Sequence, residues 1–516
     1  MSVATGTGLY PGTFALTDPD RLAVIRPATG ESLTYRELDE QSTRLANHLR
    51  SVGMKVGDNV AMVSTNDLPM LVVYWAALRS GFYVTAVNHH LTAAETNYIL
   101  DDCECKVLFA SADAADAVAA SDAVGAITHR IAWGGDLAGF AAYTDVLAAA
   151  SAEPLVDQPR GQDFLYSSGT TGVPKGVRIP LRDGQVDQVP DPYTPVFATI
   201  YAMDETTVYL SPAPLYHAAP LRFCGVTNSV GGLVVMMDRF DPETALQLID
   251  EHQVTHSQWV PTMFVRMLKL PEVVRDQYDV TSLRYAVHAA APCPPEVKRS
   301  MIDWWGPVIH EYWASTEGAG ITLINSTEAL ERPGSVGRAA LGVLRICDES
   351  GTEVPSGQIG TIYVEREELP FEYFKDAAKT ASVQHAAHPT WTTTGDVGYL
   401  DGDGYLYLTD RGSFMIISGG VNIYPQEAEN VLILHPAVYD VGIIGIPDPE
   451  MGEQVKACVQ LADGYSPSEQ LAQELIDFVK TRLAGYKAPK SVDFVDDLPR
   501  SATGKMVKRK LKERYV

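Results

Sequence analysis

The chain has few cysteines and no long hydrophobic run, and each shortage argues against a class of protein. Its six cysteines form no CxxC pair and have no histidine-rich partner segment, so neither a zinc site nor a disulfide framework is expected. The most apolar stretch, PMLVVYWAAL (Pro69–Leu78), is too short to cross a bilayer. The first residues, MSVATGTGLYPGTF, lack the basic and apolar segments of a signal peptide. We therefore expect a cytoplasmic protein with reduced thiols.

Positive charge is also scarce, with 40 Lys and Arg against 65 Asp and Glu, for a net charge of −25. This balance argues against a nucleic-acid partner and against general attraction to anionic membranes. Basic residues nevertheless gather near the C-terminus, and a solvated tail is their simplest interpretation. These residues are Lys487, Lys490, Arg500, Lys505, Lys508, Arg509, Lys510, Lys512 and Arg514.

Helix and strand patterns alternate from the start of the chain. Two capping boxes, Thr34 with Glu37 and Thr92 with Glu95, each predict a helix start. Periodicity predicts helices over 34–53 and 70–81, and strands over 59–65, 82–88 and 106–111. This alternation is typical of a parallel sheet covered by helices. The Ala- and Asp-rich piece at 110–126 is expected to be an exposed helix or loop.

A length of 516 residues requires more than one domain. A boundary is expected near residue 411, after short strands with tight Asp-Gly turns. Beyond it, strands are predicted at 439–446 and 456–461, and a helix over 468–485 with Leu471, Leu475, Phe478 and Leu483 turned inward. We therefore predict an α/β N-terminal body over 1–410 and a small α+β C-terminal domain over 414–516.

The stretch YSSGTTGVPKGV (Tyr166–Val177) combines small hydroxyl residues, glycines and one lysine, a composition that suits a phosphate chain. It is not a Walker A loop, because Lys175 follows proline and precedes glycine. By itself it fits a phosphate loop and an ordinary polar turn equally well.

Further motifs follow in a fixed order along the chain. They are HEYWASTEG (310–318), TTGDVGYLDGDGY (393–405), TDRGSFMIISGGVNIYPQEAE (409–429) and PRSATGKMVKRKL (499–511). Together with the glycine-rich loop, they resemble the adenylate-forming superfamily, and within it the AMP-forming acyl-CoA synthetases. The resemblance runs from about Thr34 to about Arg514. It implies a large N-terminal body of several α/β subdomains and a mobile C-terminal domain.

The resemblance also implies a reaction. Such enzymes join a small-molecule carboxylic acid to AMP, using ATP and Mg²⁺ and releasing pyrophosphate, and then transfer the acyl group to coenzyme A. Donors and cations must offset the repulsion between the carboxylate and the triphosphate. A homodimer is compatible with the sequence.

Site residues carry over from the matching motifs. The loop that would wrap the β- and γ-phosphates comprises Ser167, Ser168, Gly169, Thr170, Thr171, Gly172 and Lys175. The rest of the nucleotide site would comprise Ala290, Ala291, Pro292, Glu311 and Tyr312, with Trp313 flanking the adenine, Thr316 at the α-phosphate, and Asp396 and Arg411 at the ribose. Mg²⁺ would be held by Glu317 and Thr170.

The resemblance makes Lys505 the catalytic lysine, between the attacking carboxylate and the α-phosphate, and places His217 near the carboxylate. An ordinary structural histidine remains an alternative for His217. Gly419 and Gly420 would let the pantetheine arm pass in the second step. The basic C-terminal residues could meet the phosphates of CoA, an inference from charge alone.

The resemblance also places a hinge at 411–413. The hinge departs from the family pattern, with Ser413 and Phe414 where a Lys or Asp and an acidic residue are usual. The segments expected around the acid (214–223, 259–264, 288–294 and 314–320) are mostly apolar and offer no clear acidic partner for an ammonium group. A hydrophobic acid is favoured, either fatty, aryl or alicyclic. A carrier-protein loading enzyme, a luciferase-like oxygenase and an inactive nucleotide-binding relic remain alternatives.

Overall fold

A computed structural model describes residues 9–119, 122–167, 174–411, 414–419, 421–500 and 506–515. Both predicted capping boxes are present. The side-chain oxygen of Thr34 accepts from the Glu37 amide, and the Glu37 carboxylate accepts from the Thr34 amide. Thr92 and Glu95 form the same reciprocal pair. Because each box satisfies otherwise unpaired amides, the following helices begin where the sequence predicts.

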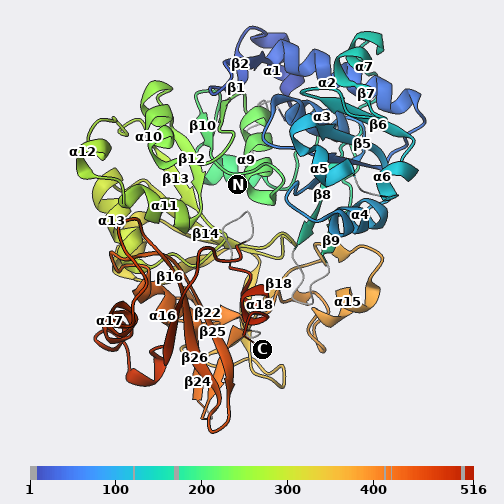
Figure 1. Cartoon of the computed structure of the whole chain (residues 1–516). Coiled ribbons are helices and arrows are strands. Elements are labelled where there is room, and N and C mark those ends of the chain that lie inside the picture. The colour runs from blue at the N-terminus through green and yellow to red at the C-terminus, as the bar shows by residue number, and fades with distance from the viewer. Residues whose placement is uncertain are drawn as a thin grey trace.

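The helices of the described part are distributed along its whole length and cover the sheets (Figure 1). They are α1 (Pro11–Thr17), α2 (Tyr35–Ser51), α3 (Leu68–Leu78), α4 (Ala93–Asp102), α5 (Ala115–Ala119), α6 (Asp122–Ala126), α7 (Tyr143–Ala149), α8 (Thr194–Ile200), α9 (Ala218–Ser229), α10 (Pro242–Glu251), α11 (Pro261–Leu268), α12 (Glu272–Arg275), α13 (Pro295–Trp305), α14 (Ser326–Glu331), α15 (Ala377–Ser382), α16 (Pro425–Leu432), α17 (Glu469–Lys480) and α18 (Lys508–Lys512). None of these helices is long and apolar enough to cross a bilayer.

One sheet of the N-terminal body contains the predicted alternating units. Its strands, in spatial order, are β19 (Glu372–Tyr373), β9 (Lys175–Arg178), β8 (Gln162–Ser167), β4 (Tyr83–Val87), β3 (Asn59–Val63), β5 (Cys105–Ser111), β6 (His129–Trp133) and β7 (Ala141–Ala142). Strands β8, β4, β3, β5 and β6 pair in parallel. The α/β prediction is therefore confirmed, and the carboxyl ends of these strands share one edge.

A longer mixed sheet forms the rest of the body. Its strands, in spatial order, are β17 (Val343–Cys347), β18 (Gly360–Glu365), β21 (Asp396–Leu400), β22 (Leu406–Arg411), β16 (Ser335–Leu341), β15 (Ile321–Ile324), β14 (Ile309–Ala314), β13 (Tyr285–His288), β12 (His256–Trp259), β10 (Val208–Ser211), β11 (Leu233–Met236), β1 (Leu22–Arg26) and β2 (Glu31–Thr34), and β20 (Trp391–Thr392) pairs with β18. The segment from β11 through β10, β12 and β13 to β14 is parallel.

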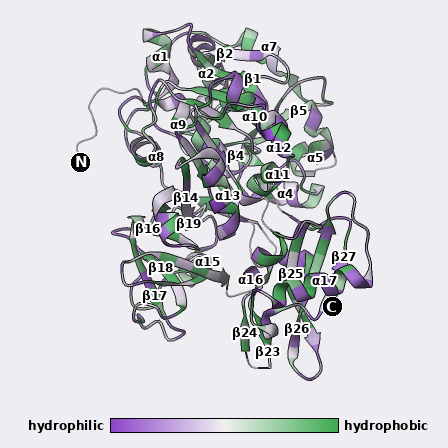
Figure 2. Ribbon diagram, turned by 90° about the vertical axis from the view of Figure 1, so that its left-hand side faces the viewer, coloured by the Kyte–Doolittle hydropathy of each residue, from purple (hydrophilic) through white to green (hydrophobic). Residues whose placement is uncertain are grey.

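The C-terminal residues form a separate α+β layer below the body in both views (Figures 1 and 2). Its strands are β24 (Val421–Ile423), β23 (Ile416–Ser418), β26 (Gly452–Leu461) and β25 (Val438–Asp448), with β27 (Ser491–Phe494) parallel to β26. Leu471, Leu475 and Val479 of α17 are buried against this sheet. The predicted inward face was wrong in one detail, because Phe478 is only half-buried and Val479 takes the core position.

The Ala- and Asp-rich piece also differs from expectation. It forms α5 and α6, and their small side chains, including Ala117, Val118 and Val124, are buried against the sheet. Alanine and valine on one helical face can pack closely even when aspartates occupy the other.

All six cysteines are free thiols. Burial raises the pKa values of Cys103, Cys224 and Cys293 to about 12, so these thiols stay protonated and unreactive at neutral pH.

Candidate active site

The two sheets of the body bring their carboxyl edges together. Asn66, just after β3, is almost fully buried and donates to the carbonyls of Ala213 (3.1 Å) and Met237 (2.8 Å). Its carbonyl oxygen accepts from the amide of Leu215 at 2.8 Å. The loop after β3 is thereby fastened to the loop after β10 of the other sheet. Ligands of open α/β sheets bind at such edges, which makes this junction the first candidate for a site.

Trp313 and Asp396 meet at the end of β14. The indole Nε1 of Trp313 donates to Asp396 Oδ2 at 3.1 Å, and the Thr394 hydroxyl donates to the same oxygen at 3.1 Å. These residues were predicted to flank the adenine and the ribose, and they lie side by side although 83 residues separate Trp313 from Asp396.

Glu317, which follows Trp313 closely in the chain, forms a second group with Tyr373 and Lys175. The Tyr373 hydroxyl donates to Glu317 Oε1 at 2.9 Å, and Lys175 Nζ lies 5.4 Å from the centre of the Tyr373 ring. Burial lowers the pKa of Lys175 and repulsion from Lys379 adds to this, whereas Glu317 opposes the shift. Tyr373 of β19 thus contacts both Lys175 of β9, the lysine of the glycine-rich loop, and Glu317, the predicted magnesium residue.

The donor set near Glu317 fits Mg²⁺. Magnesium is usually held by one or two carboxylates together with substrate phosphates and water. Glu317 is a buried carboxylate, and no group of three or more His, Cys, Asp or Glu residues suited to a metal occurs in the described ranges. Glu317 therefore suits a metal that the nucleotide brings, and does not indicate an all-protein metal cage.

Residues 289–292, which include three predicted nucleotide contacts, lie at the same edge. Strand β13 pairs in parallel with β14, with His288 opposite Glu311, so residues 289–292 leave the sheet next to Tyr312 and Trp313. Ala290 has a φ of +77°, a conformation that costs about 1–3 kcal/mol for a residue with a Cβ. Such strain is typical of functional loops.

The side chains of Glu311 and Tyr312 do not face the nucleotide site. The Glu311 carboxylate is buried and paired with Lys298, and the Tyr312 ring packs in an aromatic core. Burial raises the pKa of Glu311, and Lys298 opposes this shift. The nucleotide contacts predicted for both residues stay a prediction, and their main chains are the groups left to make them.

Sequence reasoning missed a buried ion pair under the site. Arg222 Nε lies 2.7 Å from Asp163 Oδ2, and the side chains are only 8% and 1% exposed. Burial favours a lower pKa for Arg222, but Asp163 more than offsets it and the pKa is raised. Arg222 also donates to the Thr316 carbonyl at 3.5 Å. A buried acid thus exists beside the expected acyl segment, but its charge is already neutralised. The residue spacing in the sequence gave no signal for this pair.

Aromatic rings occupy the space between α8, α9 and β14. The rings of Phe197 and Phe223 stack with centres 4.8 Å apart, and the Phe197 and Tyr312 centres are 5.6 Å apart. All are buried. His217, at the start of α9, follows Tyr216 on the same side of this core.

The segment that carries Lys505 is anchored at both ends. Arg500 forms a bridge with Met506 and an ion pair with Asp440, with donor–acceptor distances of 2.5 and 2.6 Å. On the other side, Lys508 Nζ lies 3.0 Å from Glu429 Oε1. These contacts hold Arg500 and Lys508, which flank residues 501–505, on the C-terminal layer.

The contacts between the layers are both apolar and polar, and Ile433 of the C-terminal layer packs against the body core that contains Phe264. Lys269 donates to the Val438 carbonyl, and the Arg266 guanidinium lies 5.4 Å from the centre of the Tyr439 ring. Helix α18 faces the body, whereas the hairpin of β23 and β24 points away from it in both views (Figures 1 and 2). Gly419, in that hairpin, has a φ of +58°, and its amide donates to the Met451 carbonyl at 2.8 Å.

The basic C-terminal residues are not a free cationic patch. Acidic partners lie next to most of them, in the pairs Lys487–Glu427, Arg500–Asp440, Lys508–Glu429, Arg509–Glu513, Lys512–Glu453 and Arg514–Asp497. The inference that their charge attracts CoA is therefore weakened. Phe414 lies under Lys508, whose Nζ is 5.7 Å from its ring centre, where the family pattern has an acidic residue.

Several predicted site residues lie outside the described residues. They are Ser168, Gly169, Thr170, Thr171, Gly172, Gly420 and Lys505, together with the hinge residue Ser413. Arg411 ends β22. Ser167 ends β8, so the glycine-rich loop begins at the shared carboxyl edge.

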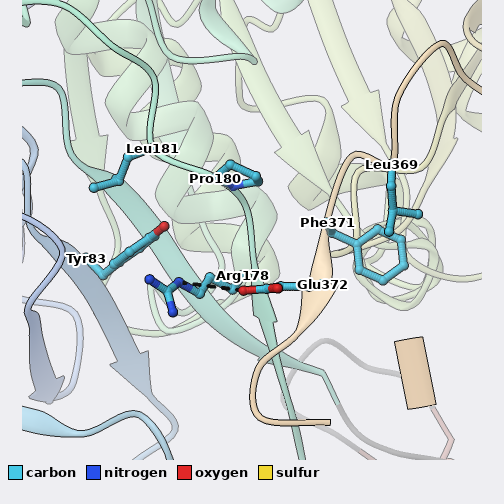
Figure 3. A pocket seen from close by; sticks show the side chains of 7 residues that line it. All are labelled: Tyr83, Arg178, Pro180, Leu181, Leu369, Phe371 and Glu372. Carbon is cyan, nitrogen blue, oxygen red and sulfur yellow. Dashed lines mark ion pairs between the residues drawn. The ribbon is translucent and has the colours of Figure 1, made fainter. Parts of the chain in front are cut away.

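A separate cavity of about 440 Å³ lies at the opposite edge of the smaller sheet. Tyr83 begins β4, and Arg178 ends β9 with its Nε 4.0 Å from Glu372 Oε1 (Figure 3). Leu181 and Phe371 contribute apolar walls. This cavity is distinct from the nucleotide residues, because it adjoins the amino end of β4.

Family models cover most of the chain. The AMP-binding enzyme model matches residues 13–374, and the AMP-binding enzyme C-terminal domain matches residues 427–505. The chain therefore belongs to the AMP-binding, adenylate-forming enzymes, and the resemblance seen in its motifs is confirmed.

Individual relatives refine this class. A feruloyl-CoA synthase from Amycolatopsis is 35% identical over 516 residues, covering 99% of each chain. A long-chain-fatty-acid–CoA ligase, FadD13, from Mycobacterium tuberculosis is 31% identical over 509 residues, covering 97% of each. The crystal structure of ATP-bound MatB from Rhodopseudomonas palustris superimposes with a TM-score of 0.81 at 30% identity, covering 98% of this chain and 99% of that one. Within its class, the chain belongs with the AMP-forming acyl-CoA ligases.

Proposed function

We propose that this enzyme converts a compact hydrophobic carboxylic acid, in particular an aryl acid, into its CoA thioester in two steps. ATP first yields the acyl-AMP and pyrophosphate, and the thiol of CoA then displaces AMP. The observation that supports this most directly is the convergence of Glu317, Tyr373 and Lys175 beside the Trp313–Asp396 pair. This arrangement combines a carboxylate, a cation and a flat ring, which suit a metal, a phosphate chain and an adenine.

In the first step, Lys175 and the glycine-rich loop would hold the β- and γ-phosphates as the pyrophosphate leaves. Asp396 would accept hydrogen bonds from the ribose, and Thr316 would donate to the α-phosphate. Mg²⁺, held by Glu317 and Thr170, would neutralise charge on the phosphate oxygens. Arg222 supports this geometry from beneath, because it donates to the carbonyl of Thr316.

Lys505 would complete the site by placing a cation between the carboxylate and the α-phosphate. The ion pairs of Arg500 and Lys508 favour this role, because they hold the residues on either side of the Lys505 segment on the C-terminal layer. His217 would contact the carboxylate of the acid. The developing negative charge is then matched by fixed donors and cations, which is the main source of catalysis in such sites.

In the second step, the C-terminal domain (414–516) would rotate about the hinge (411–413) relative to the N-terminal domain (1–410). The hairpin that contains Gly419 points away from the body, so rotation is needed to bring Gly419 and Gly420 to the pantetheine arm. Phe414 packs under Lys508 and would replace the usual acidic contact at the hinge.

The substrate class is supported by the aromatic core and by the relatives. Phe197, Phe223 and Tyr312 fill the space behind the expected acyl segment, which favours a short, flat acid over a long chain. The neutralised Asp163 leaves no anionic partner for an ammonium group, which disfavours amino acids. A feruloyl-CoA synthase, which aligns over 99% of each chain, is among the relatives.

The test is pyrophosphate release by purified enzyme with ATP and Mg²⁺, using ferulate, benzoate, octanoate, palmitate and cholate, each with and without CoA. We expect steady turnover with an aryl acid only when CoA is present. Turnover with palmitate alone would overturn the substrate class. A single turnover that only a phosphopantetheinylated carrier protein accelerates would favour the carrier-loading alternative, and light or oxygen uptake without CoA would favour the oxygenase.

A further inference from the structure

A cluster of histidines lies at the junction of the two sheets, outside the motif residues apart from His217. His89 and His90 follow β4, and their ring centres are 4.0 Å apart. The Tyr216 ring, after β10, is 5.4 Å from His89 and 4.5 Å from His217. Loops from both sheets therefore place three imidazoles around one phenol.

This cluster lies on the edge that carries the nucleotide residues. Strand β4 is parallel to β8, so His89 and the glycine-rich loop leave adjacent strands at the same end. Asn66 fixes the other half of the cluster, because it binds the amide of Leu215, next to Tyr216. The cluster thus has a fixed position relative to the phosphate loop.

The surroundings of His89 favour its neutral form. Burial lowers the pKa of His89 and the neighbouring His90 lowers it further, while the main chain of Ser64 partly opposes the shift. The Tyr216 ring also packs against His89, and burial raises the pKa of Tyr216, so the phenol stays protonated at neutral pH. A half-buried imidazole that is neutral at pH 7 can accept a proton.

We propose that His89 is the general base for the thiol of CoA in the second step, an inference that rests on the proposed function. The S–H proton passes to the neutral imidazole, the sulfur forms a bond to the acyl carbon, and the acyl–phosphate bond breaks with AMP as leaving group. The imidazolium then loses its proton to solvent beside the exposed His90. A free thiol is mostly protonated at pH 7, since its pKa is about 8.5, so a base increases the reactive fraction.

The experiment separates the two steps by rapid mixing. Enzyme is first loaded with the feruloyl adenylate, pyrophosphatase removes the pyrophosphate, and the complex is then mixed with CoA between pH 5.5 and 9.5. We expect His89→Gln to slow transfer by about 10²-fold at pH 7, within the usual range for general bases. The transfer rate of His89→Gln should rise with pH through the thiol pKa of about 8.5, whereas the wild-type transfer rate should not change with pH in that range.

Formation of the adenylate is the internal control for folding, and His89→Gln should leave it within about twofold, because His89 acts only on the thiol in this scheme. Imidazole added to His89→Ala should restore part of the transfer rate. His388→Gln, at an exposed site near Trp391, should change neither step.

The outcomes distinguish the two proposals. Normal adenylate formation with an unchanged pH profile in His89→Gln would overturn the role of His89 while leaving the proposed function intact. An equal loss of the transfer rate at every pH in His89→Gln would also overturn the role of His89. So would a larger loss of that rate in His90→Gln. Failure to form an adenylate with any acid would overturn the proposed function, and the role of His89 with it.

Discussion

The residues expected around the nucleotide and the segment that carries Lys505 are held in different ways. In the body, Arg222 and Asp163 form a buried pair directly under Thr316, and Tyr373 fixes Glu317. In the C-terminal layer, the ion pairs Arg500–Asp440 and Lys508–Glu429 flank the Lys505 segment, and all four side chains belong to that layer. The layer meets the body through contacts such as Lys269 with the Val438 carbonyl and Ile433 against the body core.

In the proposed mechanism, this difference lets a preorganised binding site work with a catalytic lysine that moves. Buried pairs cannot separate without leaving an uncompensated charge, which costs several kcal/mol. Contacts at a polar interface exchange readily with water and each contributes about 0.5–1.5 kcal/mol. We therefore expect the buried pair in the body to stay in place while the C-terminal layer reorients.

The largest effect is expected from breaking the buried pair. Arg222→Met leaves Asp163 buried without its cation, so the free energy of unfolding of the body should fall by about 3–5 kcal/mol. Urea unfolding followed by tryptophan fluorescence measures this loss. The double variant Arg222→Met with Asp163→Leu removes both charges and should recover most of it; equal losses in the two variants would mean that packing, rather than charge, explains the effect.

The next largest effect is expected at Lys505. Lys505→Ala should reduce pyrophosphate release by about 10²–10³-fold, the usual cost of removing one group that stabilises transition-state charge. The same variant, supplied with synthetic acyl-AMP, should transfer the acyl group to CoA at close to the wild-type rate. A parallel loss in both steps would show that Lys505 does not leave the site between them.

A smaller effect is expected at the magnesium residue. Tyr373→Phe removes the hydrogen bond to Glu317, and a bond to a charged group contributes about 1.5–3 kcal/mol. We expect adenylation to slow by about tenfold and to require more Mg²⁺, measured by titrating the metal at saturating ATP. Tyr363→Phe, on β18, is the matched control. An unchanged magnesium requirement would contradict the assignment of Glu317.

The smallest effect is expected at the interface between the layers. Lys269→Met removes the contact with the Val438 carbonyl and should slow adenylation by about two- to tenfold, with thioester formation unchanged or faster. Lys480→Met, on the outer surface of α17, is the control. Slower thioester formation in Lys269→Met would mean that this contact does not favour the adenylation arrangement.

Local features could be read from the sequence because they depend on neighbouring residues. The capping boxes at Thr34 and Thr92 and the alternation of helices and strands involve groups a few residues apart, and all were confirmed. The motifs likewise identified the family, since its reaction demands particular residue types in a fixed order. Boundaries shifted by a few residues, as for α3, and a core position was misassigned in α17.

Only the tertiary structure determined which distant groups meet. Arg222 and Asp163 are 59 residues apart, and Leu215 and Asn66 are 149 apart, so neither contact leaves a periodic signal. For the same reason, the pairing of the Glu311 carboxylate with Lys298 in the core could not be read from the sequence. The sequence by itself determined the chemistry of the family and the local elements. The order and pairing of the strands decided how the site is supported, because packing depends on which chain segments the sheets bring together.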